Sequence, residues 1–514
     1  MLRQSDLATS NNEMAIECKG ITKIFGSVVA NDHINLSVKY GEILALLGEN
    51  GSGKTTLMNM LSGIYYPDEG STFVGGREVI IHSPSDAMQL GIGMIHQHFK
   101  LVDVFSAMDN IVLGNSEKYL KPNELKAKIL DINHSFGLEI DPEKKVYNMS
   151  VSEKQTVEIL KVLYRGAKIL ILDEPTAVLT PQEAEKLFEI LRNMKSQGCA
   201  IIIITHKLNE VMSISDRVTI LRKGQSVDTV NTCEVDEHKL TELMVGKPIS
   251  LAINRPLVSN QHTLLKAVDL TVMRDDGTKG LDDVSFDIKG GEILGVAGVA
   301  GSGQKELCES IAGLMKITEG AILYRKENIV GKSPQEIIGL GISMSFVPED
   351  RLGMGLIASM GMVGNLMLKT YHTVKGPFVD KKPSKLLAKV LIKRLDIKTP
   401  GIDTPVRLLS GGNVQKVLLG REIESCPNLL IAAYPVRGLD INSSYTIYDL
   451  LNEQKTHGVA VLFIGEDLDV LLELSDRIMV MCNGQITGIV DARTTTKEQI
   501  GLMMTRTKEV ADNE

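Results

Sequence analysis

The sequence is poor in aromatic residues and in closely spaced cysteines. The first deficit limits the composition of the core, and the second argues against certain kinds of site. Tryptophan is absent from the 514 residues and aromatic residues make up 4%, so buried cores must consist mainly of Ile, Leu, Val and Met. The six cysteines lie far apart and form no C-x-x-C pair, which argues against a zinc or redox site and fits free thiols in a reducing compartment. The polar N-terminus lacks the apolar segment of a secretory signal.

The sequence also lacks a convincing membrane span and an excess of positive charge. The longest uncharged run of note, between Arg351 and Lys369, is rich in Gly and interrupted by Ser359 and Asn365. A spanning helix needs about 20 predominantly apolar residues, so we expect a buried loop and helix here. The net charge of −8 argues against a broad nucleic-acid surface, which would need clustered Lys and Arg. If the protein works at a membrane, other chains cross it.

The chain does contain two tandem copies of one domain. The segments 41–53 (GEILALLGENGSG) and 291–303 (GEILGVAGVAGSG) are identical at 8 of 13 positions, 250 residues apart. Further along, SDRV at 215–218 matches SDRI at 475–478, and the offset has become 260. A repeat at a fixed offset indicates a duplicated unit. About ten residues are therefore inserted in the second copy.

We predict a first domain at 14–246, a linker at 247–262 and a second domain at 263–505. The linker contains two prolines and has little periodicity. Each copy alternates helical patterns with short, continuous apolar runs such as KILILDEP and CAIIIITHK. Runs of this kind are typical of central strands buried on both faces, so we expect an α/β fold with a largely parallel sheet in each copy.

The first copy carries a complete phosphate-binding loop, GENGSGKTT, between a predicted strand and a predicted helix. Glycines let backbone N–H groups close around phosphates, and the following helix N-terminus adds partial positive charge. Lys54 is expected to bind the β- and γ-phosphates of ATP, and Thr55 to bind Mg²⁺. The residues of this loop predicted to bind ATP are Gly48, Glu49, Asn50, Gly51, Ser52, Gly53, Lys54, Thr55 and Thr56.

Two acidic residues end the apolar run ILILDEP. Asp173 closes a buried strand, where a carboxylate is costly without a cation, and we expect it to hold Mg²⁺. Glu174 follows and is the candidate general base that polarises the attacking water. The alternative is an ordinary acidic turn after a strand.

Three further residues are candidates for the same site. His206 follows the apolar run IIIIT and is expected to contact the γ-phosphate and the base, although such a histidine can also be structural. Gln97 is expected to contact Mg²⁺ or water, and its neighbours His96 and His98 raise the alternative of a different metal site. Phe25 is the candidate that stacks on adenine; the alternative is a core phenylalanine.

The segment LSGGN at 409–413 identifies the family that the chain resembles. Together with the phosphate loop, LDEP and TH, it closely resembles the ATP-binding cassette family over about residues 14–505. In that family this motif opens a helix and caps the γ-phosphate bound to the opposite cassette. The resemblance implies that Ser410, Gly411 and Gly412 complete the site of the first copy, with the two copies paired head to tail as a pseudo-dimer within one chain.

The second copy has lost most of the residues that bind phosphate or metal, while its glycines remain. We therefore expect one complete ATPase site and one degenerate site that keeps its shape for assembly. A carboxylate at position 466 would also repel a γ-phosphate. The substitutions in the second copy are Gln304 for Lys54, Lys305 for Thr55, Ala433 and Tyr434 for Asp173 and Glu174, Glu466 for His206, and Asp275 for Phe25. The resemblance implies that the degenerate site also includes the signature of the first copy, residues 149–153, in which Ser152 replaces a glycine.

Asymmetric tandem cassettes are similar to the energy-coupling subunits of bacterial importers for simple sugars and nucleosides. The segment PEDR at 348–351 is typical of that group, and HQHFKLVDVFSAMDNIVLG at 96–114 looks more like its nucleoside branch. The signature MSVSE at 149–153 departs from the usual LSVGE, and PVRGLD departs from PTRGLD, which puts nucleotide binding by the degenerate half in further doubt.

The resemblance implies a peripheral protein on the cytoplasmic face of the bacterial cell membrane. Its expected partners are two integral-membrane permease subunits and an extracytoplasmic substrate-binding lipoprotein, and no nucleic acid. The same role for a ribose- or galactose-type sugar is the alternative. A remoter alternative is a soluble tandem-cassette translation factor, a class in which both sites are generally intact.

Overall fold

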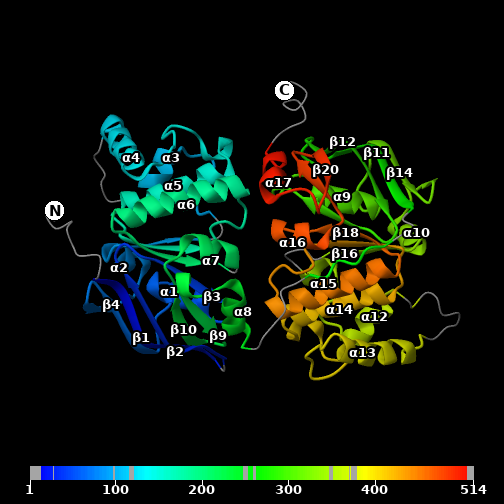
Figure 1. Cartoon of the computed structure of the whole chain (residues 1–514), viewed down its shortest axis with the longest axis horizontal. Helices are drawn as coiled ribbons and strands as arrows, with labels where there is room; N and C mark the ends of the chain where they lie inside the picture. The colour runs from blue at the N-terminus through cyan, green and yellow to red at the C-terminus, as the bar shows by residue number, and fades with distance from the viewer. Residues whose placement is uncertain are drawn as a thin grey trace. The chain divides into compact units, whose positions relative to one another are not determined.

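The structure, a computed structural model, divides into two compact units, Met1–Ser250 and Leu251–Glu514. It describes residues 13–26, 28–96, 99–114, 121–205, 207–246, 253–258, 262–346, 351–369, 371 and 379–505. Figure 1 draws the first unit in blue to green and the second in green to red. Most of the predicted linker lies outside the described residues.

The first unit interleaves strands and helices along the chain. Its strands are β1 (Met14–Phe25), β2 (Val28–Lys39), β3 (Ile43–Gly48), β4 (Glu69–Val74), β5 (Arg77–Val79), β6 (Ile92–Ile95), β7 (Ile169–Asp173), β8 (Ala200–Ile204), β9 (Arg217–Arg222) and β10 (Gln225–Asn231). Its α-helices are α1 (Lys54–Leu61), α2 (Pro84–Gln89), α3 (Ala107–Val112), α4 (Pro122–Phe136), α5 (Val151–Tyr164), α6 (Pro181–Ser196), α7 (Leu208–Ile214) and α8 (Glu237–Val245), and short 3₁₀ helices are η2 (Val146–Asn148) and η3 (Thr232–Glu234).

The second unit repeats this order. Its strands are β11 (Thr263–Met273), β12 (Lys279–Lys289), β13 (Ile293–Ala297), β14 (Glu319–Tyr324), β15 (Glu327–Asn328), β16 (Ile342–Phe346), β17 (Leu429–Ala433), β18 (Ala460–Ile464), β19 (Arg477–Cys482) and β20 (Gln485–Asp491). Its helices are α9 (Gln304–Ile311), α10 (Pro334–Gly339), α11 (Arg351–Met354), α12 (Met362–Met367), α13 (Lys382–Arg394), η4 (Val406–Leu408), α14 (Gly411–Glu424), α15 (Ile441–Thr456), α16 (Leu468–Leu474) and α17 (Lys497–Met503).

A six-stranded sheet forms the centre of each unit. In the first unit the order is β10-β9-β3-β8-β7-β6, and in the second it is β20-β19-β13-β18-β17-β16. Neighbouring strands are parallel except for the edge strands β10 and β20, which run antiparallel to β9 and β19. A separate four-stranded antiparallel sheet, β2-β1-β4-β5 or β12-β11-β14-β15, accompanies each. The predicted largely parallel α/β fold is confirmed.

Both faces of the first central sheet are covered, as its continuous apolar strands predicted. Ile169 and Ile171 of β7 pack with residues of β1, β2 and α1, whereas Leu170 and Leu172 pack with residues of α5 and α6. This alternation follows from side chains pointing to opposite faces of a strand. Figure 1 shows α3 to α6 on one side of this unit and β1, β2 and β4 on the other. All parallel strands of the sheet end at the edge where the phosphate loop lies.

The apolar run between Arg351 and Lys369 forms two short helices, α11 and α12, joined by a loop. The side chains of Met362, Val363 and Leu366 are buried in the core of the second unit, so the predicted buried helix is confirmed. The loop before it is only partly buried, contrary to the prediction, because Ile357 and Met360 are each 40% exposed. Among the residues that the structure describes, no helix combines the length and the apolar character needed to cross a membrane.

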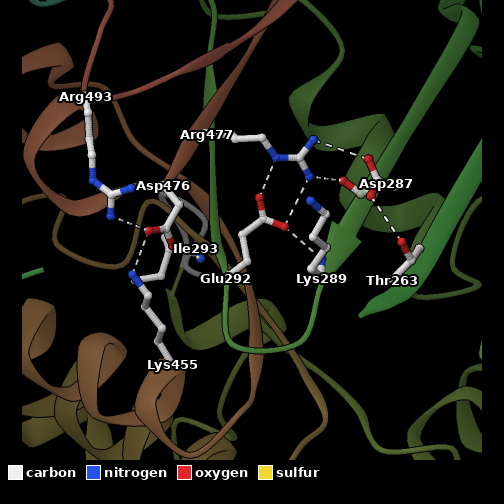
Figure 2. Close-up of polar contacts among 9 residues, drawn as sticks. All are labelled: Thr263, Asp287, Lys289, Glu292, Ile293, Lys455, Asp476, Arg477 and Arg493. Carbon is white, nitrogen blue, oxygen red and sulfur yellow. Dashed lines mark hydrogen bonds and ion pairs between the residues drawn. The ribbon is translucent and has the colours of Figure 1, made fainter. Parts of the chain in front are cut away.

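Ion pairs lie at the opposite, amino ends of β3 and β9 in the first unit and of β13 and β19 in the second. In the second unit Arg477 contacts Glu292 and Asp287, and Asp476 accepts from Lys455 at 2.7 Å and from the Ile293 amide at 3.0 Å (Figure 2). The first unit repeats the pattern, with Arg217 on Glu42 at 3.0 Å and Lys195 on Asp216 at 2.6 Å. The duplicated sequence therefore preserves the scaffold at this edge.

Candidate functional site

The first phosphate loop joins β3 to α1 through closely packed glycine backbone. Gly51 and Gly53 have φ angles of 79° and 97°, which favour glycine over other residues. A side chain at Gly53 would place its Cβ 2.5 Å from the Ala30 carbonyl oxygen. The Gly224 amide, in the turn between β9 and β10, donates to the Ser52 carbonyl at 3.2 Å. The hairpin of β1 and β2 and the β9–β10 turn thus hold the loop in place.

Lys54 is the first residue of α1, and its side chain contacts the start of this loop. Its Nζ donates to the Gly48 carbonyl at 2.6 Å and to the Glu49 carbonyl at 3.0 Å, and the residue is 8% exposed. Burial lowers the pKa of Lys54, and the charges of Glu174 and Asp173 oppose that shift. A buried ammonium at a helix N-terminus is suited to binding phosphate. The buried Ser52 hydroxyl has no hydrogen-bond partner within the described chain, as expected of a loop that closes on a ligand.

The two acidic residues lie at the carboxyl end of β7, within electrostatic range of Lys54. Burial and, after it, the negative charge of Glu174 raise the pKa of Asp173 to about 6, against the opposing effect of Lys54. Glu174 adopts a left-handed backbone conformation, with φ 46°, and its amide donates to the Ile204 carbonyl at 2.9 Å. This places Lys54, Asp173 and Glu174 in one charged group at the sheet edge.

This group offers the oxygen ligands that a hard divalent cation prefers. Two adjacent carboxylates raise the cost of ionisation of Asp173, a cost that a cation would relieve. Thr55 has an exposed position at the start of α1. The part of the chain that the structure describes contains no cluster of three or more His, Cys, Asp or Glu side chains placed to bind a metal by themselves. The residues fit a cation that is shared with a bound phosphate.

Phe25 ends β1 and is 42% exposed, so the alternative of a core phenylalanine is wrong. Tyr65 packs edge-on against its ring with centroids 5.2 Å apart, and the Lys23 ammonium lies 5.5 Å from the ring centroid. Asp68 accepts from the Ile24 amide at 2.7 Å and from the Lys23 ammonium at 2.9 Å. These contacts therefore hold the exposed Phe25 ring at the end of β1. The hairpin of β1 and β2 also contacts the phosphate loop.

Gln97 and His206 lie outside the described residues, and so does His98. Sequence reasoning missed a polar cluster at the same sheet edge: Thr176 lies two residues after Glu174, and its hydroxyl is 2.7 Å from both carboxylate oxygens of Glu210 in α7. The only sequence signal was the departure of PVRGLD from PTRGLD in the second copy, where Val436 occupies the position of Thr176. The partner, Glu210, belongs to no motif that we considered.

The second phosphate loop keeps the backbone of the first. Gly301 and Gly303 have φ angles of 88° and 105°, and the Gly484 amide donates to the Ser302 carbonyl at 3.0 Å. Gln304 is 3% exposed, and its side-chain amide donates to the Val299 carbonyl at 3.1 Å. Val299 corresponds to Glu49 in the first copy. The glutamine therefore reproduces one of the two loop contacts of Lys54 without its charge.

An ion pair internal to the second unit lies against this loop. Arg274 Nε donates to Glu306 at 2.6 Å, and a second guanidinium nitrogen donates to the Gly301 carbonyl at 3.1 Å. Glu306 occupies the position of Thr56. The strand pairings place Arg274 at the position of Phe25, so the expectation that Asp275 stands there is wrong. A carboxylate at the start of α9 disfavours a bound phosphate, which carries charge of the same sign.

The end of β17 lacks the acidic pair. Ala433 is buried, and Tyr434 keeps the left-handed backbone of Glu174, with φ 49° and an amide that donates to the Ile464 carbonyl at 2.8 Å. Burial raises the pKa of Tyr434 to about 12, so the phenol stays neutral at neutral pH. Glu466 forms an ion pair with Arg437 at 3.2 Å, which offsets the repulsive charge that the sequence placed there.

The serines of the two signature segments, 149–153 and 409–413, form different hydrogen bonds. Ser150 caps α5 in a reciprocal capping box with Glu153, so its hydroxyl accepts from its own helix at 3.2 Å. Ser410 lies before α14 without accepting such a bond, and its hydroxyl accepts from Asn413 Nδ2 at 2.7 Å. Ser410 and Gly411 are exposed at the N-terminus of a 14-residue helix. This end of α14 is suited to an anion.

A glycine loop with a buried lysine, an acidic pair at a parallel-sheet edge and a duplicated α/β unit define a P-loop ATPase with two tandem cassettes. The family model for the ABC transporter family matches residues 31–177 and 281–435. The chain belongs to this family, and it is an ATP-binding, ABC-type ATPase.

Several named relatives match nearly the whole chain. It is 43% identical to the nucleoside import ATP-binding protein NupA of Lactococcus lactis subsp. cremoris (strain MG1363), over 96% of this chain and 98% of that one. It is also 43% identical to the guanosine import ATP-binding protein NupO of Bacillus subtilis (strain 168), over 96% and 97%. The glucose import ATP-binding protein TsgD13 of Haloferax volcanii is 38% identical, over 96% of each chain.

Proposed function

We propose that the chain is the energy-coupling subunit of an importer and hydrolyses ATP at one site, built on the first unit. The observation that carries this proposal is the charged group of Lys54, Asp173 and Glu174, since its counterparts in the second unit are neutral. The import role is supported by the relatives described above. The one-site assignment rests on the residues of this chain.

In this proposal the triphosphate of ATP lies on the N–H groups of residues 48–56, with Lys54 on the β- and γ-phosphates. Phe25 stacks on adenine. Thr55 and Asp173 would hold Mg²⁺, as would Gln97, and the ion would neutralise charge on the phosphates. These assignments keep the triphosphate next to the acidic end of β7.

Glu174 accepts a proton from the attacking water, and His206 contacts the γ-phosphate. Ser410, Gly411 and Gly412 of the second unit cover that phosphate when the cassettes pair. The exposed N-terminus of α14, and a Ser410 hydroxyl that accepts no backbone N–H bond from this helix, support this role. Binding of ATP would then favour the paired state, and hydrolysis would release it.

The partners in this proposal are two permease subunits in the membrane and an extracytoplasmic substrate-binding protein, with the chain on the cytoplasmic face. Segments 98–150 and 350–408 are the proposed docking regions. Apolar side chains exposed there support this: Val104 is 67% exposed and Leu408 is 68% exposed. Val102 and Phe105, beside Val104, are exposed as well, and a group of exposed apolar side chains is typical of a protein contact.

Nucleosides are the proposed substrates, because the relatives at 43% identity are importers of nucleosides or guanosine and the glucose importer is at 38%. The test uses the chain assembled with its permeases and binding protein in lipid. ATP turnover should rise with purine or pyrimidine nucleosides and not with ribose or galactose. Stimulation by a sugar alone would overturn the substrate and leave the ATPase site standing.

The one-site claim has a separate test in the same assembly. Glu174→Gln should reduce turnover about 100-fold or more, because a general base is lost, while ATP still binds. The matched variant Tyr434→Phe should stay within about twofold of the parent, since Tyr434 is assigned no chemical role. Substantial hydrolysis by Glu174→Gln would contradict a single site. Ribosome co-sedimentation without membrane co-fractionation would favour the translation-factor alternative.

A further inference from the structure

We infer that Glu210 is a positioning residue for Glu174 and acts through Thr176. The inference rests on the proposed function, in which Glu174 is the general base. It assigns a role to a carboxylate that lies outside every recognised motif of the chain.

Glu210 is the centre of a cluster with three neighbours. The Thr176 hydroxyl lies 2.7 Å from each of its carboxylate oxygens, and the Thr205 hydroxyl lies 3.3 Å from Oε2. The Lys207 ammonium is 3.1 Å from Oε1. Thr176 and Thr205 are each 3% exposed, and the Glu210 side chain is 12% exposed. Burial of a carboxylate to this degree needs such partners.

The cluster holds the turn that carries Glu174. The Ala177 amide donates to the Glu174 carbonyl at 3.2 Å, which closes a turn that contains Thr176. Within the turn, the Thr176 side chain is held by Glu210, and its carbonyl accepts from Lys207 at 3.5 Å. Glu210 and Lys207 come from the segment after β8, whereas Glu174 follows β7. The cluster therefore connects two neighbouring strand ends.

The second unit shows that the turn itself does not require the cluster. There the Arg437 amide donates to the Tyr434 carbonyl at 3.2 Å and the Tyr434 amide to the Ile464 carbonyl at 2.8 Å, as in the first unit. The residues at the positions of Thr176 and Glu210 are Val436 and Val470, which have no polar side-chain atoms. The same backbone is thus built with an apolar pair.

An apolar pair is the less costly way to fill this space. A buried carboxylate loses hydration, and replacing buried ionic groups by apolar groups of similar size is often neutral or stabilising. The polar version occurs beside Glu174 and the apolar version beside Tyr434. The polar cluster thus occurs beside Glu174, the proposed general base. The orientation of its carboxylate matters because proton transfer depends on alignment within hydrogen-bond distance.

The experiment compares Thr176→Val, which matches the shape of threonine and the residue of the second unit, with Thr176→Ser, which retains the hydroxyl. In the assembled transporter, Thr176→Val should lower kcat roughly tenfold with the KM for ATP within about twofold, and Thr176→Ser should stay near the parent. Val436→Thr in the second unit is the matched control and should leave turnover unchanged.

Unchanged kcat in Thr176→Val would overturn the inference, and so would equal losses in ATP binding and kcat. Should Thr176→Val fail to fold, Glu210→Gln with its melting temperature measured serves instead, and the same separation of kcat from KM is expected. In a Glu174→Gln background, Thr176→Val should produce no further loss. An inactive parent protein would instead contradict the proposed function, so the two failures are distinguishable.

Discussion

The two phosphate loops have the same backbone and different electrostatics. Lys54 brings a positive charge to the carbonyls of the first loop, while Gln304 makes the corresponding contact with a neutral amide. Beside the second loop, Glu306 adds a carboxylate that Arg274 neutralises. Loop geometry follows from glycine conformations and backbone hydrogen bonds, which both units retain. Affinity for phosphate depends on charge, which only the first unit retains.

The largest expected difference between the loops concerns ATP binding. Lys54→Ala should weaken ATP binding by the full chain about 100-fold, because charge-assisted contacts to phosphate are lost. Gln304→Ala should change it by less than about twofold. Isothermal titration calorimetry on both variants gives the comparison. Equal losses would mean that the second loop also binds nucleotide.

A second difference between the units is the free-energy cost of ionising Asp173. Its counterpart in the second unit, Ala433, has no ionisable side chain. The pKa of folded Asp173 is raised to about 6 from 3.8, so ionisation destabilises the folded state as pH rises through this interval. In protein without nucleotide and Mg²⁺, Asp173→Asn should therefore be more stable than the parent at pH 7.5, by at most about 3 kcal/mol.

Melting temperatures measured from pH 4 to pH 8 check this prediction. Most of the stabilisation should be lost near pH 4, where the folded carboxyl is protonated and the unfolded carboxyl, with a pKa of 3.8, is only about half ionised. A stabilisation that stays constant across this range would show that ionisation of Asp173 is not its cause.

The ion pair beside the second loop should matter for stability and not for catalysis. Arg274→Ala leaves the Glu306 carboxylate, which is 11% exposed, without its guanidinium partner. We expect a loss of about 1 to 2 kcal/mol in the stability of the second unit, with ATP turnover unchanged. Denaturant unfolding and an ATPase assay report the two quantities. A clear rise or fall in turnover would assign a functional role to the second loop.

The smallest expected effect concerns the support of Phe25. Asp68→Ala removes the acceptor for the Ile24 amide and the Lys23 ammonium and should weaken ATP binding about threefold, through looser placement of the ring. Binding of inorganic tripolyphosphate, which has no base, should be unaffected. Thr318→Ala at the equivalent position of the second unit is the control. A parallel loss for tripolyphosphate would indicate general damage to the first unit.

Local sequence predicted much of the fold and the central residues of the site. The apolar runs ending at Asp173 and before Thr205 are β7 and β8, as expected for strands buried on both faces. The helical pattern between these two runs is α6, which begins with a capping box between Thr180 and Glu183. These features depend on residues close together in the chain, where periodicity, caps and glycine spacing act directly.

Long-range pairing was decided by the tertiary structure. Arg274 and Glu306 are 32 positions apart, and Thr176 and Glu210 are 34 apart. They meet because strand order places the hairpin of β11 and β12 against the second loop, and β7 next to β8. Such contacts leave no short-range pattern. The sequence by itself determined that the first half carries Lys54, Asp173 and Glu174, the charges for ATP chemistry. Only the tertiary structure decided which side chains contact these residues or their counterparts, because those contacts join distant parts of the chain.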